Sequence, residues 1–208
     1  MLGFVKLRQA ARGVFAFCLM VVMSTAILDR SAKAEAVTYA LDPTHLTVSF
    51  LIDHIGYAKT LGIFREVSGT FVYDEEAGTV SDINVVIATA SVDTFLEARD
   101  AHVRNKDFLN VEEFPEMTFV GTDAVAETDT NGTVTGDLTL LGVTQPVELS
   151  ATLNKSAPYP FGANPPNVLG ISIRGHFNRS DFGMAYGVEN GLVGDRVDLI
   201  IEVEAAAQ

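Results

Sequence analysis

The sequence predicts an all-β protein of antiparallel strands, with one short helix inserted near its middle. Apolar and polar residues alternate in short runs along most of the chain, and residues typical of tight turns separate these runs. No long helical pattern lies between them. Because parallel strands need long crossover connections, this favours antiparallel hairpins. About nine strand candidates suit a closed barrel or a sandwich, and a barrel leaves no strand edge exposed.

The N-terminal segment has the three parts of a secretory signal peptide. These are a positive start, an apolar run and a small-residue cleavage motif: Lys6, Arg8 and Arg12, then Val14 to Leu28, then Ala32-Lys33-Ala34. The run is about 15 residues long, short of the roughly 20 that span a bilayer. We expect residues 1–34 to be removed after Ala34, or else after Ala36, and residues 35–208 to form one exported domain. A retained N-terminal anchor is the alternative.

The charge of the remaining chain is strongly negative. Removal of the signal takes five basic residues and one acid from the full chain, which has a net charge of −13. Nine Lys and Arg then face 26 Asp and Glu, a net of −17. Such a surface repels phosphate backbones and anionic headgroups, so the composition disfavours nucleic acid and membrane binding by a basic patch. The only cysteine, Cys18, lies in the signal, which leaves the domain without disulfides.

The clearest strand runs from Leu46 to His54. Leu46, Val48, Phe50, Ile52 and His54 share one of its faces, because successive side chains alternate between the two sides of a strand. The other strand candidates, in chain order, are Val37 to Leu41, Phe64 to Tyr73, Val80 to Val92, Met117 to Val125, Thr133 to Leu141, Val147 to Asn154, Leu169 to Phe177 and Arg196 to Glu204.

Turn residues lie between these candidates at hairpin spacing. They are Glu76-Ala77-Gly78, Asn131-Gly132 and the run from Gly142 to Pro146. The segment from Lys155 to Asn167 holds four prolines, and we expect it to form a surface loop because proline cannot donate to a strand ladder.

The stretch DTFLEARDAHVRNKDFL, residues 93–109, breaks the strand pattern and predicts a helix at about 94–109. Thr94 followed by Glu97 has the spacing of a capping box. Leu96, Val103 and Phe108 fall near one side of a helix that begins there.

Motifs for catalysis or metal binding are weak. The four histidines lack the pairwise spacing of a zinc site, although ligands from distant segments could still converge. No serine lies in a Gly-x-Ser-x-Gly turn, and Asp100 with His102 would need a nucleophile from elsewhere. Arg99 and Asp100 have a structural interpretation, in which they clamp the helix to neighbouring strands by charge-assisted hydrogen bonds. His54 either binds a backbone carbonyl at the barrel rim or contacts a polar ligand.

Five stretches in order carry a family resemblance: HIGYAKTLGIF, SVDTFLEARDAHVRNKDFLNVEEFPEMTF, VTGDLTLLGVTQPVEL, NRSDFGM and VGDRVDLIIEVEA. The sequence from about Tyr39 to Ala205 resembles the YceI-like family of periplasmic polyisoprenoid-binding proteins. The resemblance implies a lipocalin-like antiparallel barrel of about eight strands whose interior holds a long isoprenoid tail. A barrel of that size has room for one slender ligand, although the same inward residues could equally fill a solid core.

On this basis we expect a lumen lined by apolar residues and a helix across one end of it. The lumen residues are Val48, Phe50, Ile52, Phe64, Phe71, Phe119, Leu138 and Leu140. Phe64 and Phe71 differ in parity, so a bulge or a turn must separate them. Leu96, Val103 and Phe108 would cover the end, and Arg99, His102 and His54 would face a polar headgroup, with Arg179, Asp181 and Phe182 of NRSDFGM bordering the same region.

The expected function is a periplasmic carrier, not an enzyme, that binds a polyprenyl phosphate or the tail of an isoprenoid quinone and needs no covalent cofactor. We expect the protein to contact a membrane transiently for lipid exchange and to form a homodimer. One rival is an enzyme that acts on a hydrophobic substrate with Asp100 and His102. A second rival is an accessory module of a membrane redox protein.

Overall fold

A computed structural model describes residues 36–208 of the chain. The expected signal peptide, residues 1–34, therefore lies outside the described residues. Among residues 36–208 no helix has the length and apolar character needed to cross a membrane.

The described residues form ten strands, one α-helix and two short 3-10 helices. The strands are β1 (Val37–His54), β2 (Ala58–Phe64), β3 (Val67–Asp74), β4 (Thr79–Ala88), β5 (Val92–Asp93), β6 (Glu116–Ala126), β7 (Asn131–Leu140), β8 (Val143–Pro158), β9 (Asn167–Asn178) and β10 (Val193–Ala207). The helices are η1 (Thr89–Ser91), α1 (Glu97–Arg104) and η2 (Arg179–Phe182).

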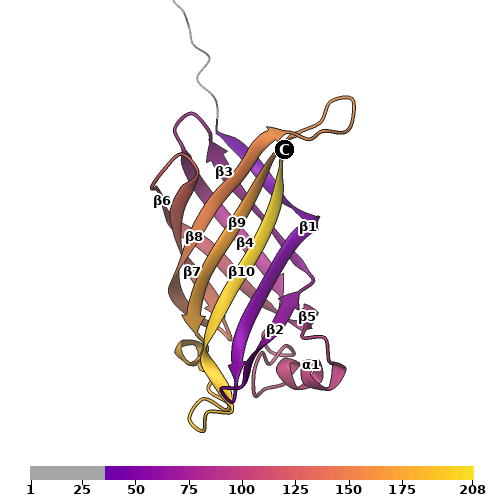
Figure 1. The fold of residues 1–208 in the computed structure, drawn as a ribbon, viewed down its shortest axis with the longest axis vertical. Coiled ribbons are helices and arrows are strands. Elements are labelled where there is room, and N and C mark those ends of the chain that lie inside the picture. The colour runs from indigo at the N-terminus through magenta and orange to yellow at the C-terminus, as the bar shows by residue number, and fades with distance from the viewer. Residues whose placement is uncertain (1–35) are drawn as a thin grey trace, which may run out of the picture. The chain divides into compact units, whose positions relative to one another are not determined.

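Eight of these strands close into an antiparallel barrel, which confirms the predicted fold class (Figure 1). The order around the barrel is β1, β3, β4, β6, β7, β8, β9 and β10, and β10 pairs with β1 to close it. The long β1 serves two partners along one edge. Its first residues, Val37 to Ala40, pair with β3, whereas Val48 to His54 pair with β2. β2 in turn pairs with the short β5, which leads into α1.

Three predicted strand boundaries were wrong. The candidates at 37–41 and 46–54 are one strand, with an irregularity between Leu41 and Leu46 that shifts the register against β10. The candidate at 64–73 is two strands, β2 and β3, so the turn that the parity of Phe64 and Phe71 required is present and Ala58–Phe64 was missed. The candidate at 80–92 is divided into β4 and β5 by η1.

The proline-rich segment is also shorter than predicted. β8 continues to Pro158, which pairs with Asn167 of β9, so only residues 159–166 form the loop. Proline is tolerated here because the ladder ends at this pair.

Glycines that face inward give aromatic rings room inside the barrel. A Cβ on Gly62 would lie 2.2 Å from the ring of Phe50, its neighbour across the β1–β2 ladder. A Cβ on Gly136 would lie 2.3 Å from the ring of Phe119. Both rings therefore occupy the space where a side chain of the neighbouring strand would lie, and a larger residue at either glycine would force the ring out of place.

Candidate ligand cavity

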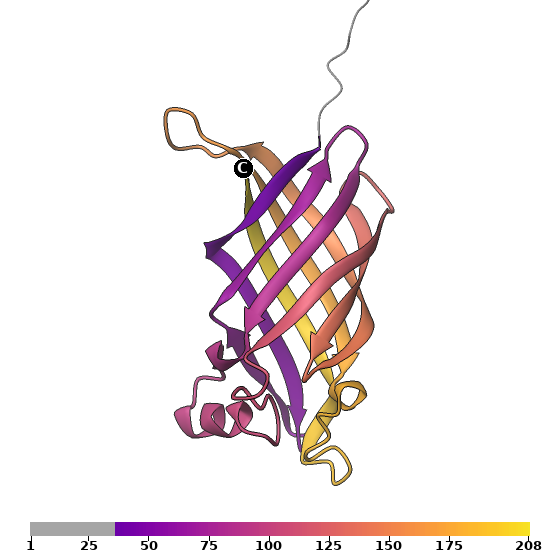
Figure 2. The same ribbon diagram turned by 180° about the vertical axis from the view of Figure 1, so that it is seen from behind.

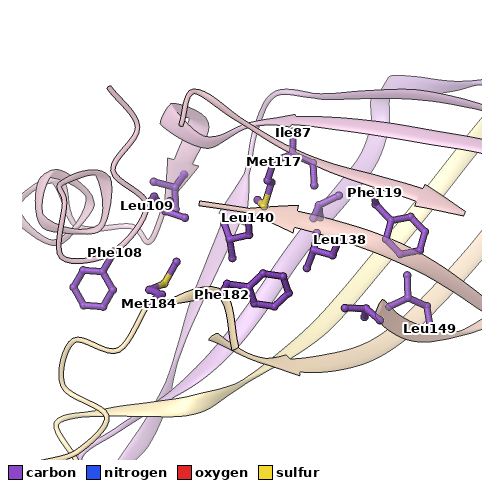
Figure 3. Packing of buried hydrophobic residues seen from close by; sticks show 13 residues of the cluster. Ile87, Phe108, Leu109, Met117, Phe119, Leu138, Leu140, Leu149, Phe182 and Met184 are labelled. Atoms are coloured by element: carbon purple, nitrogen blue, oxygen red, sulfur yellow. The ribbon is translucent and has the colours of Figure 1, made fainter. Parts of the chain in front are cut away.

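The barrel encloses a cavity of about 530 Å³. This volume falls within the range of roughly 300–1,000 Å³ that is typical of small-ligand sites. Figure 3 shows Phe119, Leu138 and Leu149 around the interior, and Phe108 with Met184 toward α1. All eight residues predicted to face the lumen lie on the cavity wall: Val48, Phe50, Ile52, Phe64, Phe71, Phe119, Leu138 and Leu140. Their contact with a ligand stays a prediction.

Strands from all around the barrel contribute to this wall, because every second residue of each strand points inward. Val85 and Ile87 come from β4, Leu149 from β8, Ile173 from β9 and Leu199 from β10. Nearly all of these side chains are hydrocarbon. Such a wall binds a slender apolar chain and offers water no hydrogen bonds.

An aromatic cluster closes the end of the barrel away from α1. Phe71 and Val80 line the cavity there, and the ring of Tyr39 stacks on Phe71 with centroids 5.7 Å apart and planes 12° apart. Tyr73 packs edge-on against Tyr39 at 6.4 Å, and burial raises the pKa of Tyr73. Asn167 Nδ2 donates to the Tyr39 hydroxyl at 3.1 Å, so this buried polar group is satisfied. We call Tyr39, Phe71, Tyr73, Leu169 and Val203 the closed-end cluster.

Polar side chains enter the cavity wall at the opposite end, which we call the mouth. They come from the end of β1, from β2, from α1 and its approach, and from the segment after η2: Asp53, His54, Thr60, Thr94, Arg99, His102, Arg179 and Tyr186. The two views of the barrel place the β1–β2 turn, α1 and this last segment at the same end (Figures 1 and 2). A ligand with a polar head and an apolar tail would therefore fit in one orientation only.

α1 is anchored by contacts that the capping-box prediction did not foresee. The N-cap is Leu96, whose side chain has no atom that can accept a hydrogen bond. The helix spans only Glu97–Arg104. Thr94 instead donates its backbone N–H to the buried Asp100 carboxylate at 2.7 Å, and its hydroxyl donates to the same oxygen. The prediction of a capping box was thus wrong. Thr94 lies two residues before the N-cap and binds the side chain of Asp100 in the first turn of the helix.

Arg99 and Asp100 hold the helix by hydrogen bonds, but to Thr94 between β5 and α1 and not, as the clamp interpretation had it, to a strand. Arg99 Nε donates to Thr94 Oγ1 at 2.7 Å, and its Nη2 donates to the carbonyl oxygen of Thr94. Both acceptors are neutral, and no ion pair among the described residues includes Arg99. A positive charge at the mouth thus has no paired carboxylate. Arg104, which the sequence reading missed, adds bonds to Ala90 O at 2.9 Å and Val92 O at 2.7 Å.

Three aromatic rings meet across the mouth. His102 of α1 lies 5.0 Å from Phe108 and 5.2 Å from Tyr186, and Phe108 lies 5.2 Å from Tyr186, all edge to face. His102 Nε2 is 3.0 Å from Asp107 Oδ2. The group joins α1 to the segment after η2. Tyr186 was not predicted, although the three nearby glycines with positive φ, Gly183, Gly187 and Gly191, mark that segment as a constrained loop.

Arg179 lines the cavity as predicted, yet its donors are directed at the protein. It is 1% exposed and donates to four carbonyl oxygens, those of Met184, Tyr186, Val193 and Gly194, at 2.8–2.9 Å. Its guanidinium also lies 5.7 Å from the ring centre of Phe108. Burial lowers the pKa of Arg179, and the charge of Asp195 acts in the opposite direction. Arg179 therefore holds the segment of residues 184–194 in place.

Three residues predicted to border the cavity lie elsewhere. Phe182 is fully buried, but it packs edge to face on Phe177 at 5.3 Å and is not on the cavity wall. Asp181 is exposed, and its backbone carbonyl accepts from Gln145. Leu96 is 54% exposed, so it does not cover the lumen. Val103 and Phe108 do lie on the wall.

Asp100 and His102, the two residues of the catalytic alternative, do not bond to each other in this arrangement. The Asp100 carboxylate binds Thr94, whereas His102 pairs with Asp107. His54, exposed at the end of β1, lies on the cavity wall at the mouth.

A group of possible metal ligands lies at the β1 irregularity. Asp42, His45 and Glu204 bring their ligand atoms within 4.8 Å of one another there. His45 Nδ1 is 2.8 Å from Asp42 Oδ2, so these groups bond to each other at the surface.

Comparisons with known proteins agree with this fold. Residues 39–205 match the model of the YceI-like domain. The chain is 37% identical to Protein YceI of Escherichia coli over 184 residues, which cover 88% of this chain and 93% of that protein. Protein YceI of Salmonella arizonae is 38% identical over the same shares of both chains.

Solved structures show the same architecture. The YceI protein of Campylobacter jejuni superimposes with a TM-score of 0.67 at 29% identity, covering 75% of this chain and 89% of that one. A polyisoprenoid binding domain from Saccharophagus degradans has a TM-score of 0.59 at 17% identity, covering 83% and 99%, and this likeness concerns the fold alone. From its match over the whole barrel and its curated relatives, the chain belongs to the YceI-like family.

Proposed function

We propose that this protein is a periplasmic carrier of a long isoprenoid lipid, a polyprenyl phosphate or an isoprenoid quinone, and not an enzyme. The observation that carries the proposal is the apolar cavity whose polar side chains gather at one end, apart from Ser49 of β1, whose hydroxyl donates to the Ile200 carbonyl. The tail runs from the mouth toward Phe71, and the head stays near Arg99 and His102. The name of the Saccharophagus degradans domain, a polyisoprenoid binding domain on the same fold, supports the ligand class.

The energetics favour a carrier over a permanent store. Burial of an isoprenoid of eight units at about 0.8 kcal/mol per carbon would release about 30 kcal/mol if the lipid came from water. That exceeds the ceiling of roughly 18–21 kcal/mol for non-covalent affinity. The lipid comes instead from a membrane in which its tail is already buried. Transfer into the barrel is then nearly balanced, and the proposed cycle includes a transient membrane contact.

A cavity-filling variant tests the proposal. Ile52 lies on the wall between Phe50 and His54, so Ile52→Trp places its ring in the volume assigned to the tail. We expect the variant to lose most of its lipid while its urea midpoint changes little. Lipid is extracted and quantified, and unfolding is measured, on the same preparations.

The control is Leu51→Trp, on the neighbouring residue that the cavity wall does not include. It should keep the lipid. If Ile52→Trp retains full lipid occupancy, no tail passes Ile52. If it loses about 1–3 kcal/mol of stability and wild type has no lipid to lose, the barrel interior acts as a filled core.

A further inference from the structure

Exposed apolar side chains gather around the mouth. Six of them form what we call the mouth rim: Ile55 and Tyr57 in the β1–β2 turn, Phe95 and Leu96 before α1, and Tyr186 and Leu192 before β10. Their exposure ranges from 42% to 88%. All three segments lie at the same end of the barrel in both views (Figures 1 and 2). Single exposed apolar residues are common on proteins, but six at one end of the barrel, three of them on the cavity wall, are not explained by scatter.

The mouth rim is continuous with the cavity. Ile55, Tyr186 and Leu192 belong to the cavity wall and are also more than 40% exposed. An apolar surface therefore extends from the interior, over these three residues, to the outside. At the closed end, by contrast, Tyr39 is buried and does not line the cavity.

Backbone geometry holds two rim residues outward at a cost. Ile55 has φ +55° and Phe95 has φ +66°, a left-handed conformation that bulky residues rarely adopt. The Asp93 carboxylate accepts the Phe95 N–H at 2.7 Å, and the Asp53 carboxylate accepts the Gly56 N–H at 2.7 Å. Glycine or asparagine would adopt these backbone angles with less strain. Both turns instead present a large apolar side chain to the outside.

We propose that the mouth rim docks the barrel, mouth first, on the surface of an uncharged or zwitterionic lipid bilayer. The inference rests on the proposed function, because a tail that leaves through the mouth would otherwise cross water. Tyrosine, phenylalanine and leucine are residues that enter the interface between headgroups and acyl chains. With the rim at this depth, Ile55, Tyr186 and Leu192 provide apolar surface between the acyl chains and the cavity wall.

Charge selects the bilayer over a second copy of the chain as the occupant. The domain carries many more acids than bases, so two copies brought together repel each other through their net charge. A zwitterionic bilayer brings no net charge to the contact. Docking then depends on apolar insertion, and salt should affect it little.

Flotation with vesicles of pure phosphatidylcholine tests the proposal, using protein purified from its native host without detergent. The variants are Tyr57→Ser and Phe95→Asn, the latter because asparagine accepts the left-handed backbone. The matched control is Phe161→Ser, an aromatic residue 73% exposed in the loop at the other end of the barrel. We expect the double rim variant to bind vesicles at least tenfold more weakly than wild type, and the control to bind as wild type does.

The outcomes separate this proposal from the one on which it rests. Equal vesicle binding by wild type and the double variant would overturn docking by the rim, as would a binding constant that falls steeply between 0.1 and 0.5 M NaCl. Sedimentation that shows a rim-dependent dimer, with unchanged vesicle binding, would assign the rim to a second copy instead. Lipid extracted from the same double variant tests the carrier function independently, since rim loss should slow exchange and leave bound lipid in place.

Discussion

The two ends of the barrel are built from different chemistry. At the closed end, Tyr39 of β1 stacks on Phe71, its partner in the β1–β3 ladder, and its hydroxyl is satisfied by Asn167. At the mouth, the pairing of β1 passes from β3 to β2, and non-strand segments complete the wall. We infer that packing at the closed end stabilises the barrel, whereas the polar side chains and non-strand segments at the mouth contact the ligand.

The largest expected effect concerns the closed end. Tyr39→Ala removes a ring that is 4% exposed and leaves a void against Phe71 and Tyr73. We expect the free energy of unfolding to fall by about 3 kcal/mol, as for other buried aromatic truncations. Urea denaturation followed by far-UV circular dichroism measures it.

Phe161→Ala, in the exposed loop at the same end, is the control and should cost less than about 0.5 kcal/mol. Because Tyr39 does not line the cavity, lipid content in folded Tyr39→Ala should stay near wild type. An equal loss of stability in both variants would show that the buried packing of Tyr39 does not stabilise the closed end.

A smaller effect is expected at the mouth, where Arg99 has no paired carboxylate. Arg99→Gln keeps a donor for Thr94 but removes the charge. We expect the affinity for a polyprenyl phosphate to fall about five- to tenfold, or about 1–1.4 kcal/mol, and the affinity for a quinone with the same tail to stay unchanged. Titration of delipidated protein with each lipid measures both.

The matched control is Arg174→Gln, on an exposed arginine whose contacts are with Ile173, Ile201 and Glu202. It should leave both affinities unchanged. Equal losses for the phosphate and the quinone in Arg99→Gln would show that the arginine supports α1 and does not select a headgroup.

The smallest expected effect is a pH dependence at the β1 irregularity, away from the mouth. Hydrogen bonds from His45 and then Thr44 lower the pKa of Asp42 to about 2, and the bond to Asp42, followed by the charge of Glu204, raises the pKa of His45. Because the pKa of Asp42 is lowered in the folded protein, its carboxylate stabilises the fold at pH values above the ordinary pKa of 3.8. This stabilisation is lost as the pH falls toward 2. A raised histidine pKa adds stability below 6.5, which is lost as the pH rises through the folded value.

The urea midpoint of wild type should therefore exceed that of His45→Gln most clearly near pH 5.5, by a small margin because the groups are exposed. The margin should narrow at pH 2.5 and at pH 9. A margin that is constant across this range would mean that the pair does not titrate with folding.

Strand parity could be predicted from the sequence because it depends on local alternation. Val48, Phe50 and Ile52, with Leu138 and Leu140, lie on the cavity wall as that alternation requires. The division of 64–73 into two strands could not be placed, since it depends on β1 exchanging partners from β3 to β2. That exchange is a tertiary event with no local signal.

The mouth was harder to predict for the same reason. Thr94 has the spacing of a helix cap, but the buried Asp100 carboxylate competes for its hydroxyl and its N–H. Phe182 is a large apolar residue like those that line the lumen, yet the one-turn helix η2 directs its ring onto Phe177. The positions of side chains at the mouth depend on contacts between residues far apart in the chain. The inward or outward direction of strand residues depends only on local alternation.

The most direct test of the account is the lipid content of wild-type protein purified from its native host without detergent. Native mass spectrometry, followed by extraction and identification of the released lipid, measures it. The account predicts close to one isoprenoid lipid per barrel, with a mass that disappears in Ile52→Trp. Protein that carries no lipid, or one that carries a ligand without an isoprenoid tail, would contradict it.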